Sequence, residues 1–270
     1  MRRAIASEWV KLRRKGMLGA LGGVIAVTML GTVITVLTVG SSTTTKSPRG
    51  GGPFGGKSSV SLAQITSSHG LADALGNAGT LLGIIVMGVV AASVAGEFST
   101  GTLRNLLVRE PRRVRLLSGK LVGLASAITL AVVVASATAI LAGLLAASSK
   151  GLSVHAWGSG SGIGSTAVAV VELVAATLGW GVLGAVLAVV FRSPVIAVVV
   201  GVVYALPLES ILGTISSSVS RWLPGKLLAA IAVGGNSTAG LTAASWTIVI
   251  YAALAIGGTL LLFSRRDVPV

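Results

Sequence analysis

The chain has 270 residues, of which 53% are hydrophobic and only 10% charged, and its mean hydropathy is +0.92. In a water-soluble domain roughly a quarter of all residues are charged. Most of the surface of this chain is therefore expected to face lipid. The net charge of +14 lies in short segments between long apolar runs, which fits an anionic membrane surface and excludes a nucleic-acid partner. The lack of cysteine excludes disulfides and thiolate metal sites, and His69 and His155 lack the spacing of a zinc enzyme.

Residues 2–15 are the first predicted element, an amphipathic helix that lies along the inner leaflet of the membrane. Ile5, Trp9 and Leu12 recur at helical spacing on one side, with Trp9 at the depth of the headgroups. The opposite side carries basic residues that are expected to anchor the chain at the inner leaflet: Arg3, Lys11 and Arg14. An alternative stays open, in which these basic residues only fix the topology.

Six long apolar stretches follow, and a helix needs about 20 apolar residues to cross the hydrocarbon core. The sequence therefore predicts an all-α integral membrane protein, a single transmembrane domain over residues 1–270, with spans at 16–39, 74–96, 121–149, 163–191, 194–212 and 244–263. The first stretch is longer than the apolar core of a signal peptide, so we expect it to be an uncleaved span. Between the fourth and fifth spans, Ser193 is suited to cap a helix that begins at Pro194.

The basic residues predict which way the spans face, because cytoplasmic loops are enriched in Lys and Arg. With the N-terminus inside, fifteen of the 21 basic residues fall on the cytoplasmic side and six on the other side. Arg265 and Arg266 follow the last span, and they lie inside only if the number of spans is even. Six spans with both termini in the cytoplasm satisfy this requirement.

The stretch Gly51–Ser58 matches the pattern of a phosphate-binding loop, GxxxxGK[ST]. Such a loop must follow a buried strand and open a helix, whereas the residues before this match form a polar coil rich in Ser and Thr. The match also falls on the extracytoplasmic side, in a loop too short to contain a nucleotide-binding domain. We therefore interpret it as a flexible Gly/Ser linker.

The segment 97–120 lies between the second and third spans on the predicted cytoplasmic side. An acidic residue, Glu97, is followed by the turn Ser99-Thr100-Gly101-Thr102, a short apolar stretch, a proline, a basic cluster and the pair Gly119-Lys120. This order of residues resembles the ABC-2 type transporter permeases, and implies a transmembrane domain like that of the type V exporters. The resemblance extends over the whole chain, from the basic N-terminus and the six spans to the run Arg221-Trp222-Leu223-Pro224-Gly225 before the last span.

The resemblance implies that a short helix in this segment docks on a separate cytoplasmic ABC ATPase. Two ATPase subunits would then drive two permease subunits, either copies of this chain or a homologous pair, and ATP and Mg²⁺ would bind to the ATPase, with no cofactor on this chain. Glu97 and Arg104 offer opposite charges for docking, while Leu103, Leu106 and Leu107 offer an apolar ridge. The residues expected to couple the two proteins are Glu97, Thr100, Gly101, Thr102, Leu103, Arg104 and Leu107.

The basic cluster that follows, with Arg112 and Arg113, is expected to contact lipid phosphates. An alternative stays open for the whole segment 97–120, in which it is an anchor that only lipid recognises. Glu97 and the Ser-Thr-Gly-Thr turn would serve no purpose in such an anchor. They therefore favour the interpretation that this segment couples the chain to an ATPase.

Two acids fall in or near the later spans. Glu172 lies inside the fourth span, where a charge costs about 2.5–3.5 kcal/mol and should face protein or water. It is either a polar point on a translocation path or a neutral contact between helices. Glu209 is expected near the outer interface in contact with solvent. Residues 213–243 are too apolar for a free loop and too broken for a span, so they predict a re-entrant or interfacial helix near Leu227 to Val233 that caps the outer side.

These features predict the permease subunit of an ABC exporter in the bacterial cytoplasmic membrane, with no catalytic activity of its own. The modest polar content of the spans favours an amphipathic cargo, such as a drug, an antimicrobial peptide or a lipid-like molecule. Two alternatives stay open: a secondary transporter or channel, and a membrane sensor or anchor that transports nothing. A single acid inside the spans and the lack of a detectable repeat argue against an ion-driven transporter.

Overall fold

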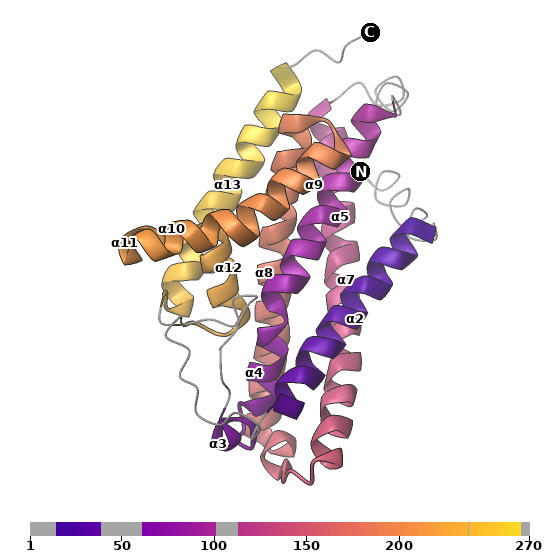
Figure 1. The fold of residues 1–270 in the computed structure, drawn as a ribbon. Helices are drawn as coiled ribbons and strands as arrows, with labels where there is room; N and C mark the ends of the chain where they lie inside the picture. The colour runs from indigo at the N-terminus through magenta and orange to yellow at the C-terminus, as the bar shows by residue number, and fades with distance from the viewer. Residues whose placement is uncertain (1–14, 39–60, 101–112, 237, 266–270) are drawn as a thin grey trace.

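The computed structural model describes residues 15–38, 61–100, 113–236 and 238–265, and every regular element within these ranges is helical. In this described part, six helices are long and apolar enough to cross a membrane (Figure 1). The prediction of an all-α membrane protein with six spans is therefore confirmed. The N-terminal interfacial helix and the phosphate-loop match at Gly51–Ser58 lie outside the described residues, and the interpretation of both stays a prediction.

Most spans are single helices, while the second and the fifth are interrupted. The spans are formed by α2 (Lys15–Thr38), α4 (Gly70–Asn77) with α5 (Gly79–Ser99), α7 (Arg113–Ser149), α8 (Gly160–Phe191), α9 (Pro194–Val203) continuing through the π-helix η2 (Tyr204–Leu208) into α10 (Glu209–Ile215), and α13 (Leu241–Arg265). The short elements are α3 (Leu62–Ile65), the 3-10 turn η1 (His155–Gly158), α11 (Ser217–Ser220) and α12 (Pro224–Ala232).

The helices extend beyond the apolar stretches that predict the spans. α7 begins at Arg113, although the sequence predicts the third span only from residue 121, and α5 continues through Glu97 to Ser99. Charged residues mark the edge of the hydrocarbon core, but they are good helix formers and do not end a helix in water. Of the predicted loop 97–120, only residues 101–112 lie between these two helices.

The tight turn between α8 and α9 is built from Arg192, Ser193 and Pro194. Arg192 has a φ of 54°, so it ends α8 in the left-handed conformation that usually requires glycine. Ser193 is extended, and Pro194 takes the first helical position of α9, where its missing N–H leaves no hydrogen bond unmade. The Ser193 side chain makes no capping hydrogen bond, so Pro194 alone supplies the predicted start signal.

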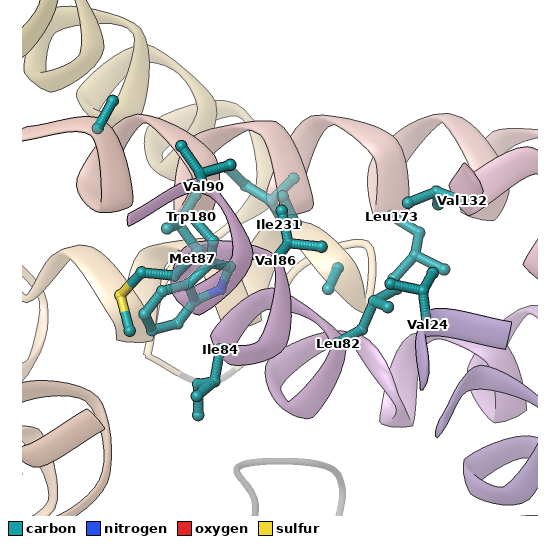
Figure 2. Close-up of a cluster of buried hydrophobic side chains, with 14 of the residues drawn as sticks. Val24, Leu82, Ile84, Val86, Met87, Val90, Val132, Leu173, Trp180 and Ile231 are labelled. Carbon is teal, nitrogen blue, oxygen red and sulfur yellow. The ribbon is translucent and has the colours of Figure 1, made fainter. Parts of the chain in front are cut away.

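The core lies along α5 and α8, where Met87 and Val90 of α5 and Trp180 of α8 are buried together (Figure 2). Glycines on both helices allow the two backbones to pack closely. Gly83 of α5 faces the indole of Trp180, which is almost completely buried, and Gly184 of α8 faces the Met87 carbonyl. Small residues allow helix backbones to approach in a membrane, where packing takes the place of the hydrophobic effect. α2 packs mainly on α7, beside this central pair.

Gly83→Ala is expected to lower the midpoint of thermal unfolding in detergent. The added methyl group would overlap the Trp180 indole, and overpacking of a close contact costs about 1–3 kcal/mol. Gly88→Ala on the same helix is the matched control, because its methyl group would meet only a Val198 methyl at 3.9 Å. Equal midpoints for the two variants would contradict the close packing of α5 on α8.

The two ends of the bundle are distinct. At one end, which we call the C-terminal end, Phe98 of α5, Leu117 of α7 and Leu260 of α13 form a small apolar cluster. At the opposite end, the α3 end, Ile65 and Trp157 belong to a second cluster with residues of α2, α4 and α7, and the Trp157 indole donates a hydrogen bond to the Ile65 carbonyl at 2.7 Å. The two ends are therefore closed by separate contacts, on either side of the core.

The outer faces of the spans are apolar and exposed. Leu145 on α7, Val195 on α9 and Leu254 on α13 are 71%, 71% and 69% exposed. Apolar patches of this extent are rare on water-soluble monomers and mark surfaces that contact a membrane or a partner. The multi-pass membrane location thus follows from the folded surface as well as from the composition.

Candidate coupling site

An ion pair joins the two helices that flank residues 101–112. Lys120 Nζ of α7 lies 2.5 Å from Glu97 Oε1 near the end of α5, and it also donates a hydrogen bond to the Ser93 carbonyl at 3.3 Å. Lys120 is only 7% exposed, and the Glu97 side chain is 14% exposed. Because water is largely excluded, this pair is screened less by salt than a surface ion pair.

The end of α5 is fixed by local hydrogen bonds as well. The Thr100 hydroxyl and the Thr100 N–H both donate to the Gly96 carbonyl, at 2.7 Å and 3.0 Å, and close the last turn. The Ser99 hydroxyl donates to the same carbonyl at 3.1 Å. Three donors therefore converge on the Gly96 carbonyl and hold the last turn of α5 in place.

A second contact joins this end of α5 to the turn between α8 and α9. The guanidinium carbon of Arg192 lies 6.0 Å from the centroid of the Phe98 ring, at the outer limit of a cation–π contact. Glu97 and Phe98 are neighbours in the sequence, so two successive residues of α5 contact two different parts of the bundle, α7 and the turn after α8. The C-terminal end of the bundle is thus organised around the last turn of α5.

Glu209 is a buried acid in the interior of the fifth span, and the prediction that it is solvated is wrong. It is only 3% exposed, although it lies four residues before the end of the apolar stretch Pro194–Gly213. Glu209 Oε1 accepts a hydrogen bond from the Gly225 N–H at 2.7 Å, and the carboxylate also accepts from the Lys226 N–H and the Tyr204 side chain. We call these four residues the Glu209 cluster.

The Glu209 cluster fixes the short helix α12 inside the bundle. Gly225 and Lys226 belong to the first turn of α12, whose N–H groups have no partner within the helix, and the carboxylate supplies one. A side chain at residue 225 would overlap the carboxylate, so glycine lets Glu209 approach the first turn of α12 in this position. Beyond the first turn, α12 is buried from Leu227 to Ala232 and packs on α5, α8 and α13.

The prediction failed at Glu209 because the decisive partner is distant in the sequence. The end of an apolar stretch predicts contact with solvent, whereas the first turn of α12 approaches from sixteen residues further along the chain and covers the carboxylate. The π-helix η2, with Pro207 inside it, also changes the register of the span directly before Glu209. The one signal present in the sequence is Pro224-Gly225, a typical helix start that requires an acceptor for its free N–H groups.

Comparison with known proteins identifies the family. Residues 4–208 match the model of the ABC-2 family transporter proteins. This chain belongs to that family. The match covers the first four spans and the fifth as far as Leu208, and it ends directly before Glu209. No curated protein matches the chain.

Most of the residues expected to couple this ABC-2 permease to an ATPase lie outside the described residues. Glu97 and Thr100 are described, and both belong to the end of α5, as given above. The other five are Gly101, Thr102, Leu103, Arg104 and Leu107, and their role stays a prediction. The same holds for the lipid anchors Arg3, Trp9, Lys11, Arg14 and Arg112, while Arg113 is the first residue of α7.

Glu172 of the permease lies on α8 against the turn that follows α12. It is half-buried, and its carboxylate approaches Gly234, which has a φ of 69° and leaves room for it. Glu172 and Glu209 therefore lie beside opposite ends of α12, one at its C-terminus and one at its N-terminus. A role for Glu172 on a translocation path stays a prediction.

Proposed function

We propose that this permease is the membrane subunit of an ATP-driven exporter, and that residues 97–120 connect it to a separate ABC ATPase. The C-terminal end of the bundle then faces the cytoplasm, where the ATPase docks on the segment 101–112. ATP and Mg²⁺ bind to the ATPase, and this chain hydrolyses nothing itself. Family membership supports the pairing with an ABC ATPase in general terms.

The observation that carries this proposal is the ion pair between Glu97 and Lys120. It ties the end of α5 to α7, so both ends of the intervening segment are held by one contact. A movement that an ATPase imposes on residues 101–112 therefore displaces α5 and α7 together. A segment that only anchors the chain to lipid does not need an ion pair that holds its two ends together.

The packing of the core supports a route by which such a movement reaches the rest of the bundle. α5 packs closely on α8 through Gly83 and Gly184, and α8 receives the Leu228 side chain of α12 against Gly179. Contacts between backbone and bulky side chains leave little room for sliding, so the helices shift as a unit. The movement would therefore reach α12, which the Glu209 cluster attaches to the fifth span.

The distribution of charge supports the orientation. The described basic residues Lys120, Arg192 and Arg265 belong to the C-terminal end of the bundle, and α13 terminates there. In the sequence, fifteen of the 21 basic residues fall on this side. Both termini are therefore cytoplasmic in the proposed arrangement, and the membrane is the plasma membrane of a bacterium.

An amphipathic cargo fits the proposal best, because the described spans offer few polar groups in their interior. Asp73, Glu97, Glu172 and Glu209 are the buried or half-buried acids within the spans that the structure describes. We propose a drug, an antimicrobial peptide or a lipid-like molecule as the class of cargo, exported by two permease subunits and two ATPase subunits.

The absence of cysteine makes the proposal testable by single substitutions. Leu107→Cys in the purified complex, labelled with a maleimide that carries a benzophenone, is expected to form a cross-link to the ATPase on irradiation, because the excited benzophenone inserts into C–H bonds of a neighbouring protein. Ser161→Cys, at an exposed position of the α3 end, is the matched control and is expected to form none. A complex that contains no ATPase after mild extraction from native membranes would contradict the proposed function.

The same approach tests the orientation separately. In intact cells a membrane-impermeant maleimide is expected to label Ser161→Cys, and to label Ser99→Cys only after permeabilisation, because both side chains are exposed but lie at opposite ends. The reverse pattern would overturn the orientation and leave the family membership untouched.

A further inference from the structure

A cavity of about 940 Å³ lies at the α3 end, between the facing sides of α7 and α8. Ile140 and Leu144 line it from α7, and Ile163, Ala167 and Val170 line it from α8. Cavities of roughly 300–1,000 Å³ are typical of sites that hold small molecules. The size alone therefore allows a ligand, and the chemistry of the walls decides its class.

The walls of the cavity are apolar, because their polar groups already have partners. The Thr166 hydroxyl donates to the Gly162 carbonyl of its own helix at 2.8 Å, and the Trp157 indole donates to Ile65. The Ser148 hydroxyl donates to the Leu145 carbonyl, also at 2.8 Å. A hydrocarbon chain fits such walls, whereas a polar ligand would lose its hydrogen bonds to water without replacement.

The length of the cavity matches the depth of one leaflet. Along α7 the lining runs from Ile140 to Ser148, which is about 12 Å at 1.5 Å per residue. One leaflet contributes about half of a hydrocarbon core that is roughly 30 Å thick. An acyl chain aligned with the lipids of that leaflet therefore reaches from the mouth to the far end of the cavity.

The mouth of the cavity is polar and positively charged. It is formed by the turn after α7, where Ser153 and His155 are exposed and line the cavity, and Lys150 is exposed directly before the lining residue Gly151. No acid lines the cavity, and the chain has no Asp or Glu between Lys120 and Glu172. This charge favours an anionic headgroup over a neutral or cationic one.

We propose that this cavity binds one anionic phospholipid, with an acyl chain between α7 and α8 and its phosphate at the mouth beside Lys150. The site lies away from the segment 97–120 and goes beyond the export function. It requires only that the helices span a membrane, and in the proposed orientation the lipid comes from the outer leaflet.

Native mass spectrometry of the full chain in mild detergent, titrated with phosphatidylglycerol, tests the proposal. The wild-type chain is expected to retain one phosphatidylglycerol more tightly than any further lipid. Ala167→Trp is expected to weaken that binding roughly tenfold, which corresponds to about 1.4 kcal/mol, because the indole occupies the acyl-chain space. Leu144→Trp fills the same space from α7 and is expected to have the same effect.

Val171→Trp is the matched control, because Val171 is 68% exposed on the outer face of α8, next to the lining residue Val170. Its affinity for phosphatidylglycerol is expected to equal that of the wild type. Lys150→Glu is expected to weaken the binding of phosphatidylglycerol roughly fivefold or more and to leave the binding of phosphatidylcholine unchanged.

Equal affinities in Ala167→Trp, Leu144→Trp and Val171→Trp would overturn the proposal, as would equal retention of the two lipids by the wild type. The measured affinities for lipid do not depend on the outcome of the maleimide-labelling and cross-linking experiments. A failure of the lipid site and a failure of the export proposal are therefore distinguishable.

Discussion

Glu209→Ala is expected to release the first turn of α12 from the fifth span and to destabilise the folded permease. The carboxylate accepts hydrogen bonds from Gly225, Lys226 and Tyr204 in a nearly water-free position. Interhelical hydrogen bonds in membrane proteins average about 0.6 kcal/mol each, so three of them amount to about 2 kcal/mol. The midpoint of thermal unfolding in detergent should fall by roughly 5 °C.

The conservative variant separates the loss of hydrogen bonds from the loss of charge. Glu209→Gln keeps an acceptor for the Gly225 N–H, and its midpoint is expected to lie between those of the wild type and Glu209→Ala. Ser210→Ala is the control, because Ser210 is exposed on the next position and bonds only to Leu206 of its own helix. If Glu209→Ala unfolds at the same temperature as Ser210→Ala, the Glu209 cluster does not fix α12.

The second large effect is expected at the ion pair beside the coupling segment. Lys120→Met removes the cation that pairs with the largely buried Glu97 carboxylate, and removing one partner of a buried ion pair costs about 3 kcal/mol. The variant is expected to insert into the membrane but to lose cargo-stimulated ATP hydrolysis in the complex, because α5 and α7 no longer move together. The measurement is the ATPase rate of the purified complex with and without cargo.

A charge exchange provides the stringent form of this test. Glu97→Lys alone places two cations together and is expected to abolish the stimulation of ATP hydrolysis by cargo. The double variant Glu97→Lys with Lys120→Glu restores a pair of opposite charges and is expected to recover part of this stimulation. Arg221→Met removes an exposed cation that takes no part in this ion pair, and its ATP hydrolysis is expected to respond to cargo as in the wild type. If cargo stimulates ATP hydrolysis equally in Lys120→Met and in the wild type, the ion pair between α5 and α7 has no part in coupling.

The sequence predicts the spans well, because each span depends on a local property. About 20 consecutive apolar residues determine a membrane helix, and α2, α8 and α13 each begin within three residues of the predicted span. The start of α7 was predicted eight residues too late, because hydropathy detects the hydrocarbon core and not the end of the helix.

The contacts of the candidate site depend on residues that are distant in the sequence, and a single sequence does not predict them. The motif contains both Glu97 and Lys120, but nothing in the sequence predicts that they form an ion pair with each other. The burial of Glu209 is not predicted either, because α12 and the π-helix η2 determine its surroundings together. The coupling roles of Leu103, Arg104 and Leu107 stay predictions, which the cross-linking experiment addresses.

The ion pair between Glu97 and Lys120 also has a thermodynamic consequence for the recruitment of a partner. These two residues are 23 positions apart, and their contact holds the ends of the intervening segment together before any other protein arrives. Fixing the two ends of a segment reduces the conformational entropy that the segment loses when it binds a partner. If the ATPase docks on residues 101–112 as proposed, the affinity of the permease for it is expected to fall in Lys120→Met, although the variant leaves the docking segment unchanged.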